Sequence, residues 1–379
     1  MPRRIRRRRL DGWSDPHLLF RALNPDASHV VWLDGGGDAS AGLSILGVAH
    51  ASSEFVTADV AAGTISRSWP AASDRPTLTI PASVDDVFAL LGERLGEYHV
   101  PEEATGAPGP VLGWFGWFGY EFGARIVGVP AARTDAPDAA FLWLDRAVVF
   151  DHARRSAELV WLDDDSDLDL DDDSVEAWSR ETAAVWASLR PLAGADLAPD
   201  PATAPTASTP VARWRHGPAT YAGLIAACQE AIHRGDAYQL CLTNRIDVDV
   251  TPDPASTYLA LRETSPSHHG GYLRFGEHAL LSASPELFLH VTSDGVVSTK
   301  PMKGTRPRHS DAEEDRRLRR ELHESEKERA ENLMIVDLMR NDLGRVAELG
   351  SVCVPEVMAV EPYAGLSHLV DVVRCVSVG

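Results

Sequence analysis

The segment EKERAENLMIVDLMRNDLGRV, residues 326–346, changes from charged to apolar along its length. Together with the charged stretch before it, this pattern predicts helical structure over residues 311–346, in one or two segments. Because the apolar part must be buried, the carboxylates of Glu328 and Glu331 lie where the helix enters the core. That position favours a functional site there over a purely solvated helix face.

Glu328 and Glu331 are candidate metal ligands. They are three residues apart, so at about 100° per residue they lie about 60° apart on one helix face, with Glu324 one turn earlier. Two such carboxylates can share Mg²⁺, which prefers oxygen ligands and keeps waters that a substrate can replace. The alternative is a solvated Glu-rich face, which the spacing alone does not exclude.

Lys303 stands in TKPMKGTRPR, residues 299–308, between an apolar methionine and a Gly-Thr pair. The backbone is expected to be extended after Pro301 and to turn at Gly304, where backbone N–H groups and the Thr305 hydroxyl can bind a carboxylate. Burial and two neighbouring arginines would lower the pKa of this lysine and free its amine. From these residues alone, Lys303 is an exposed turn lysine, an anion clamp or a nucleophile.

Glu286 and His368 are further candidates for acid–base chemistry. Glu286 follows a proline at the start of a predicted strand, and an adjacent strand of the same hairpin carries Lys303. A carboxyl and an amine could therefore line one cavity, although a strand glutamate most often faces solvent. His368, in the apolar strand GLSHLVDV, is either a catalytic group or a core histidine with satisfied hydrogen bonds.

The composition is that of a globular protein with an acidic balance. Hydrophobic residues make up 44% and charged residues 24% of the 379 residues, and the formal net charge is −20. That charge argues against a nucleic-acid partner, and an anionic substrate would need local cations, helix N-termini or a metal. The sequence contains no run of about 18 apolar residues, so it predicts no membrane-spanning helix. Four widely spaced cysteines without a C-x-x-C pair favour a reducing, cytoplasmic location over a disulfide or zinc framework.

The chain is predicted to divide into four parts. Residues 1–12 form a basic tail that we expect to be disordered, with a nucleic-acid or targeting arm as the alternative. Residues 13–195 form a mainly β N-terminal region, residues 196–213 a Pro/Ala/Thr-rich linker, and residues 214–379 a second region that carries the candidate site.

Local patterns predict further elements. Helices are expected at residues 84–98, 174–190 and 220–235, and a long strand at residues 237–250. The run DDDSDLDLDDDS, residues 163–174, lacks the spacing, central glycine and terminal glutamate of an EF-hand loop, so it predicts a solvated acidic loop rather than a calcium site.

Six motifs occur in a fixed order in the second region: GDAYQLCLT, SASPELF, PMKGTRPR, EKERAENLMIVDLMRNDLGRV, GSVCVPE and GLSHLVDVV. In this order they resemble the chorismate-utilising enzymes, which include anthranilate synthase component I, aminodeoxychorismate synthase component I, and the isochorismate and salicylate synthases. The resemblance covers residues 215–379, while WLDGGG and GWFGWFGYEFG are similar to the N-terminal region of the ammonia-using members.

The resemblance implies an α+β fold of the anthranilate synthase component I type. Two large, mainly antiparallel β-sheets would pack as a sandwich, with helices outside and the active site between the sheets. Family members continue well past the HLV strand with further substrate- and metal-binding motifs. We therefore expect the sequence to be truncated and the fold to be incomplete at its C-terminus.

Two positions favour one branch of this family. Gln239 stands where the water-adding members carry a lysine, which resembles the ammonia-using branch and makes Gln239 a candidate substrate-binding residue. The motif at residues 301–305 has Lys303 where anthranilate synthases have alanine. The chain therefore resembles aminodeoxychorismate synthase component I, of para-aminobenzoate and folate biosynthesis.

The resemblance also implies a role for each candidate. Lys303 would attack C2 of chorismate and expel the C4 hydroxyl, with Glu286 as acid–base and His368 near the leaving group. Ammonia would then add at C4 and displace the lysine, giving 4-amino-4-deoxychorismate. Glutamine amidotransferase chemistry on a partner subunit or domain would supply the ammonia. The remaining roles are substrate contacts by Gly304 and Thr305, and Mg²⁺ binding by Glu328 and Glu331.

Two other outcomes stay open on the sequence alone. The first is an anthranilate synthase component I-type amination of chorismate. The second is a truncated, non-catalytic remnant that acts only as an interaction partner.

Overall fold

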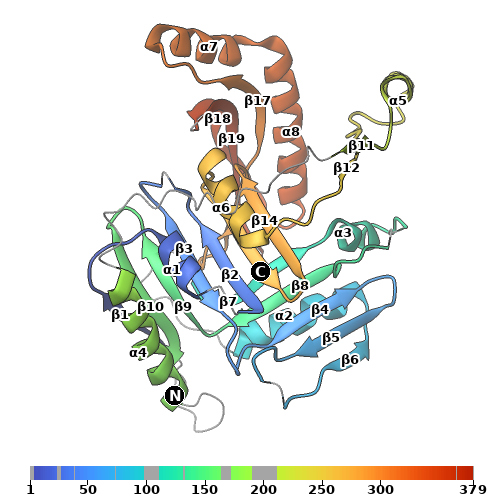
Figure 1. Ribbon diagram of the computed structural model, residues 1–379. Helices are drawn as coiled ribbons and strands as arrows, with labels where there is room; N and C mark the ends of the chain where they lie inside the picture. Colours follow the sequence, from blue (N-terminus) through green and yellow to red (C-terminus); the bar gives the residue numbers. More distant parts are fainter. Residues whose placement is uncertain are drawn as a thin grey trace. The chain divides into compact units, whose positions relative to one another are not determined.

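The computed structural model describes residues 4–23, 27–37, 39–72, 74–97, 111–130, 133–163, 172–189, 211–363 and 365–378. Its helices and strands are coloured along the chain in Figure 1. The chain forms two compact units, Met1–Ala193 with Tyr258–Gly379, and Gly194–Thr257. The predicted division at a linker is therefore corrected: residues from 258 onward belong with the N-terminal region, because one of their strands pairs with an N-terminal strand.

A seven-stranded antiparallel sheet makes this connection. Its order is β1-β10-β9-β3-β2-β13-β14. The strands are β1 (Arg4–Leu10), β2 (His29–Asp34), β3 (Leu43–Val48), β9 (Arg146–Asp151), β10 (Ser156–Asp163), β13 (His269–Phe275) and β14 (His278–Ser284). β13 and β14 form the hairpin directly before the candidate site, so this sheet anchors the site to the N-terminal region.

The basic N-terminal segment is ordered, and the prediction of a disordered tail at residues 1–12 is wrong for β1. All seven of its residues pair with β10, from Arg4 opposite Asp163 to Leu10 opposite Ala157. The reason is charge complementarity at the sheet edge. Arg6 contacts Asp163 at 2.6 Å, and Arg7 contacts Glu158 at 3.1 Å.

A five-stranded sheet packs against the seven-stranded one. Its order is β6-β5-β4-β8-β7, and its strands are β4 (Phe55–Asp59), β5 (Thr64–Ser68), β6 (Leu78–Pro81), β7 (Gly113–Phe118) and β8 (Ala139–Leu144). Trp117 of β7 stacks on Phe275 of β13, with ring centroids 5.0 Å apart. Gly116 is required in the aromatic motif, because a Cβ there would lie 1.8 Å from the carbonyl oxygen of Ala140. The glycines of this motif therefore allow close backbone packing under its large rings.

A third antiparallel sheet carries most of the candidate site. β15 (Leu287–Val291), β16 (Val296–Lys300), β19 (Leu366–Val376) and β17 (Met302–Pro307) follow one another, and β18 (Cys353–Pro362) also pairs with β19. The predicted helix at residues 311–346 forms as α7 (Ala312–Glu324) and α8 (Glu326–Gly344). Both helices contact β17, β18 and β19, and they lie beside these strands in Figure 1.

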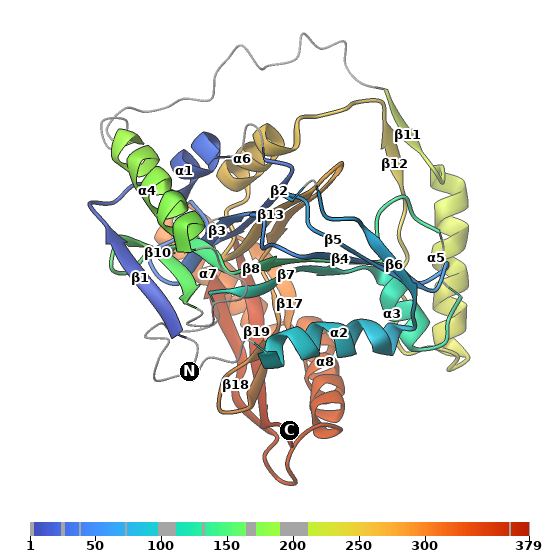
Figure 2. The ribbon, with the colours of Figure 1, turned by 90° about the horizontal axis from the view of Figure 1, so that it is seen from below.

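Within the described residues, four helices belong to the N-terminal part of the larger unit. α1 (Pro16–Leu23) contacts α4 (Asp172–Leu189), and the two lie side by side in Figure 2. Trp186 of α4 donates its indole N–H to the carbonyl of Asp11 at 2.9 Å. α2 (Val84–Glu97) contacts α3 (Tyr120–Ile126), and α2 packs on the five-stranded sheet. The helices predicted at residues 84–98 and 174–190 are confirmed.

The smaller unit contains α5 (Pro218–His233) and a short ladder of β11 (Ala212–Trp214) with β12 (Ile246–Val248). α6 (Pro254–Thr264) begins in this unit and ends in the larger one. The helix predicted at residues 220–235 is confirmed as α5. The long strand predicted at residues 237–250 is wrong: within the described part of this unit, only β11 is available as a pairing partner, and it matches three residues.

The α+β class with mainly antiparallel sheets is confirmed, since every strand pair of the three larger sheets is antiparallel. The acidic run at residues 163–174 and the linker at residues 196–213 lie mostly outside the described residues. Among the helices that the structure describes, none is long and apolar enough to cross a membrane.

Candidate active site

Lys303 lies in β17 rather than in an exposed turn. β17 pairs with β19 so that Lys303 is opposite Leu369 and Thr305 is opposite His368. The two strands change register between these pairs, which makes a bulge in β17. The turn expected at Gly304 is this bulge.

Gly304 brings the bulge of β17 against α8. Its φ is +77°, a conformation that favours glycine. A Cβ there would lie 3.0 Å from Oε2 of Glu328 and 3.0 Å from Leu322. The missing side chain therefore lets the carboxylate of Glu328 approach the backbone next to Lys303.

Three lysines occur in the whole sequence, Lys300, Lys303 and Lys327. The ammonium of Lys300 is held by both carboxylate oxygens of Glu361, at 2.7 and 2.8 Å. Lys327 is exposed on α8, whereas Lys303 is partly buried. Among the residues that the structure describes, the side-chain amine of Lys303 has no ion-pair or hydrogen-bond partner, so it is available to a ligand.

Glu286 reaches the backbone beside Lys303. It precedes β15, and its Oε1 accepts a hydrogen bond from the backbone N–H of Met302 at 3.3 Å. The loop before it is held by Ser284, whose hydroxyl accepts the N–H of Glu286 at 3.3 Å. The predicted hairpin does not form in the described sheet, because β15 pairs with β16 and β17, which carries Lys303, pairs with β19. Glu286 meets the lysine strand through the backbone N–H of Met302.

His368 is fixed by two contacts. Its Nδ1 lies 3.0 Å from the hydroxyl of Thr305, the residue opposite it across the sheet. The ring of Tyr363 packs against the imidazole nearly at right angles, with centroids 5.3 Å apart. His368 is partly buried rather than enclosed in the core, so it remains accessible to a ligand.

Tyr363 connects His368 to the lysine-bearing strands. Its hydroxyl lies 3.3 Å from Oε2 of Glu361 and 4.0 Å from the sulfur of Met302. Burial, followed by the negative charges of Glu361 and Glu286, raises the pKa of Tyr363 to about 12. The phenol therefore stays protonated and donates to Glu361 at neutral pH.

Glu328 and Glu331 stand in the first turns of α8. Ser325 caps this helix, and its hydroxyl accepts the N–H of Glu328 at 3.4 Å. Glu328 is 14% exposed and lies 3.5 Å from the guanidinium of Arg306. Across the described ranges, no group of three or more His, Cys, Asp or Glu side chains is arranged to hold a metal. Two carboxylates still fit Mg²⁺, which commonly takes one or two protein carboxylates and completes its shell with waters and substrate oxygens.

The structure gathers seven of the eight predicted site residues in the larger unit. Gln239 is an exposed residue of the smaller unit, between α5 and β12. It stays a predicted substrate contact.

A family model described as chorismate binding enzyme matches residues 70–376. That match covers well over half of the chain. The chain belongs to the chorismate binding enzymes.

Curated relatives place this family member near two kinds of enzyme. An aminodeoxychorismate synthase from Streptomyces griseus is 39% identical over 380 residues, covering 98% of this chain and 50% of that protein. Aminodeoxychorismate synthase component 1 of Klebsiella aerogenes is 35% identical, covering 78% of this chain and 61% of that protein. Anthranilate synthase component 1 of Streptomyces coelicolor is 37% identical, covering 79% of this chain and 58% of that protein. The chain spans about half to three fifths of the length of these relatives.

Solved structures agree on the fold. Anthranilate synthase component I from Streptococcus pneumoniae superposes with a TM-score of 0.64 at 24% identity, covering 96% of this chain and 74% of that one. The isochorismate synthase MenF from Escherichia coli superposes with a TM-score of 0.60 at 16% identity, covering 99% of this chain and 71% of that one. The predicted anthranilate synthase component I-like fold is confirmed.

Two residues of this family member's site were missed by sequence reasoning. Glu361 and Tyr363 alternate with apolar residues in VEPYAGLSHLV and meet Lys300 and His368 only in the folded sheet. A usable signal was present, because two polar side chains at i and i+2 of a strand share one face.

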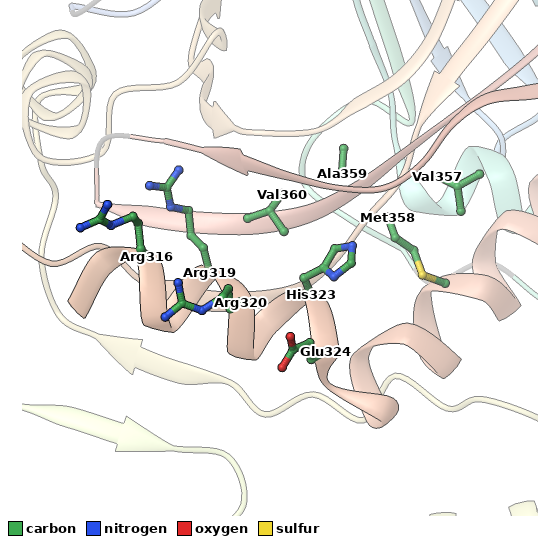
Figure 3. A pocket seen from close by; sticks show the side chains of 9 residues that line it. All are labelled: Arg316, Arg319, Arg320, His323, Glu324, Val357, Met358, Ala359 and Val360. Atoms are coloured by element: carbon green, nitrogen blue, oxygen red, sulfur yellow. The ribbon is translucent and has the colours of Figure 1, made fainter. Parts of the chain in front are cut away.

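A cavity on the third sheet does not contain the predicted site. It measures about 630 Å³ and is lined by α7 and β18. Figure 3 shows Arg316, Arg319, Arg320 and His323 on its helical wall and Val357–Val360 on the strand wall. The chemistry-bearing residues lie elsewhere on the same sheet, around the β17–β19 pair.

Proposed function

We propose that this chain aminates chorismate to 4-amino-4-deoxychorismate through a covalent bond to Lys303, in para-aminobenzoate biosynthesis. The observation that carries the proposal is the setting of Lys303. Its amine has no counter-ion in the described part of the chain, while the neighbouring Lys300 is neutralised by Glu361. An amine without a counter-ion, on a strand whose neighbouring Met302 N–H is bound by Glu286, suits covalent catalysis with acid–base assistance. Relatives named aminodeoxychorismate synthase support the same product.

The reaction would run in two displacements. The amine of Lys303 forms a bond to ring carbon C2 of chorismate, the two conjugated ring double bonds each shift by one position, and the C4–O bond breaks. Glu286 gives its proton to the departing hydroxyl, which leaves as water, and His368 lines the leaving-group side. Glu286, now a carboxylate, takes up the proton that the alkylated lysine releases. Ammonia then forms the C4–N bond, the two double bonds shift back, and the C2–N bond to Lys303 breaks, with the proton lost by the new amino group passing to the departing lysine amine.

The other residues would bind and orient the substrate. Gly304 and Thr305 offer a backbone N–H and a hydroxyl for substrate oxygens, and Gln239 is also proposed as a substrate-binding residue. Glu328 and Glu331 would hold Mg²⁺, which when bound neutralises a substrate carboxylate in an otherwise acidic protein. We also propose that a glutamine amidotransferase subunit or domain supplies ammonia, and that the protein is cytoplasmic, which its four free cysteines support.

Product analysis tests the reaction. The chain is incubated with chorismate, MgCl₂ and ammonium, and the products are separated by liquid chromatography and identified by mass. We expect 4-amino-4-deoxychorismate. Anthranilate would instead support an anthranilate synthase-type reaction, which the 37% identical Streptomyces coelicolor relative keeps under consideration. Unchanged chorismate would contradict catalysis by this chain and favour a non-catalytic role.

A further inference from the structure

Asp371 is a fully buried carboxylate with hydrogen bonds to two segments of the site. Its Oδ1 accepts the backbone N–H of Met358 in β18 at 2.7 Å. Its own backbone N–H donates to the carbonyl of Pro301, which precedes the lysine strand, at 3.2 Å. Asn332 of α8 is also fully buried and adjoins Glu331 in sequence. Burial raises the pKa of Asp371, and the Met358 N–H and the Asn332 side chain act in the opposite direction.

The contact with Met358 caps a bulge in β18. Between Glu356 and Ala359, β18 advances three residues while β19 advances two, from Val372 to Val370. Met358 lies inside this irregularity with a φ of +54°, which is uncommon for a residue other than glycine. Its N–H is therefore turned out of the regular ladder, and the carboxylate of Asp371 accepts it.

The bulge sets the register of the strand that surrounds His368. Beyond it, Val360 lies opposite Leu369 and Glu361 lies opposite His368. Glu361 is the residue that neutralises Lys300 and accepts from Tyr363. A slip of one residue would move Glu361 to the other face of the sheet, because side chains alternate along a strand.

We propose that Asp371 is a positioning residue: its carboxylate fixes the bulge at Met358 and so places Glu361 and Tyr363 around His368. The part of the proposal that concerns turnover rests on the proposed function, because it assigns a catalytic role to His368. The part that concerns strand register does not.

Hydrogen exchange of the whole chain, followed by mass spectrometry, tests the register. Asp371→Leu removes the acceptor while keeping a side chain of similar size. We expect exchange in peptides containing Met358 to speed up about tenfold, as for a buried donor that loses its partner. Asp371→Asn should exchange like the native chain, because its amide oxygen can accept the same N–H. If Asp371→Leu does not fold, Asp371→Ser takes its place in the experiment, because the shorter serine side chain does not reach the N–H of Met358.

Ser367→Ala is the matched control. Ser367 lies on the same buried face of β19, and its hydroxyl has no hydrogen-bond partner in the described part of the chain. It should leave exchange at Met358 unchanged. Native-like exchange in the Asp371 variants that lack the acceptor, or equal acceleration in Ser367→Ala, would overturn the proposal.

Steady-state kinetics with chorismate, Mg²⁺ and ammonium then test the effect on turnover. Asp371→Leu should lower kcat much more than it changes KM, and Asp371→Asn should restore kcat. Equal kcat in the native chain and Asp371→Leu would overturn the positioning role. A native chain that forms no product would contradict the proposed function, while the exchange result would still decide whether Asp371 sets the register.

Discussion

The hydroxyl of Thr305 lies 3.0 Å from Nδ1 of His368, directly across the β17–β19 pair. This contact fixes the rotation of the imidazole and occupies one of its two nitrogens. In the part of the chain that the structure describes, Nε2 is therefore the nitrogen left for a substrate. The strand that carries the candidate nucleophile also orients the candidate acid–base group.

Thr305→Val should lower kcat because it removes this hydroxyl while preserving the branched shape. A net hydrogen bond contributes about 1 kcal/mol, so we expect roughly a fivefold to tenfold loss in ammonia-dependent turnover. Thr305→Ser keeps the hydroxyl and should retain most activity. If both variants lose activity equally, the hydroxyl contact is not what orients His368.

Gly304→Ala should destabilise the protein and displace Glu328. An alanine there combines a left-handed φ with contacts of 3.0 Å to Glu328 and Leu322. Gly276→Ala is the control, because its φ is +62° and no atom lies within 4 Å of the added Cβ.

Urea denaturation should therefore show a loss of about 1 kcal/mol for Gly276→Ala and a clearly larger loss for Gly304→Ala. Equal losses would mean that backbone strain alone explains the requirement for glycine. In that case, α8 does not depend on the bulge for its position.

The ion pair between Asp34 and Arg262 should be important for folding. Its atoms approach to 2.6 Å, and the two side chains are 1% and 9% exposed. Asp34→Asn should lower the free energy of unfolding by about 3 kcal/mol, because a guanidinium is left buried without its main partner. Asp337→Asn, in an exposed pair with Arg340, should cost less than about 1 kcal/mol. Similar losses in the two variants would contradict a structural role for the buried pair.

Stability should fall as the pH drops below about 6.5, partly because of His29. Burial, followed by the positive charge of Arg274, lowers the pKa of His29 to about 4. The unfolded chain then binds a proton more readily than the folded one between these two pH values. The stability due to neutral His29 is therefore present above pH 6.5 and is lost as the pH falls through about 4.

His29→Phe should make unfolding less sensitive to pH over this range. The new ring can occupy the same place against Phe55 and Phe275, whose centroids lie 4.7 and 5.9 Å from the imidazole. Chemical denaturation at several pH values would measure the change in slope. A slope equal to that of the native chain would show that His29 does not titrate during unfolding in this range.

Local patterns predicted the helices and the site strands well. The change from charged to apolar residues located α8, and the Pro-x-x-Gly-Thr motif located the bulge that carries Lys303. These features depend on residues close together in the sequence, whose periodicity and backbone preferences act locally.

Features that depend on distant partners were not predictable in the same way. The arginines of β1 look like a solvated tail until Asp163 and Glu158 lie opposite them. Residues 237–245 have strand-forming side chains, but in the described part of their unit β11 pairs only with Ile246–Val248. Tyr363 became a site residue only when the β18–β19 register brought its ring to His368.

Intact-mass analysis of the chain incubated with chorismate and Mg²⁺, without ammonia, tests the central claim most directly. The sequence has three lysines, so the adduct can be assigned by comparing Lys303→Ala with the exposed control Lys327→Ala. We predict an added mass of chorismate minus one water in the native chain and Lys327→Ala, and none in Lys303→Ala. An adduct that persists in Lys303→Ala would contradict Lys303 as the nucleophile.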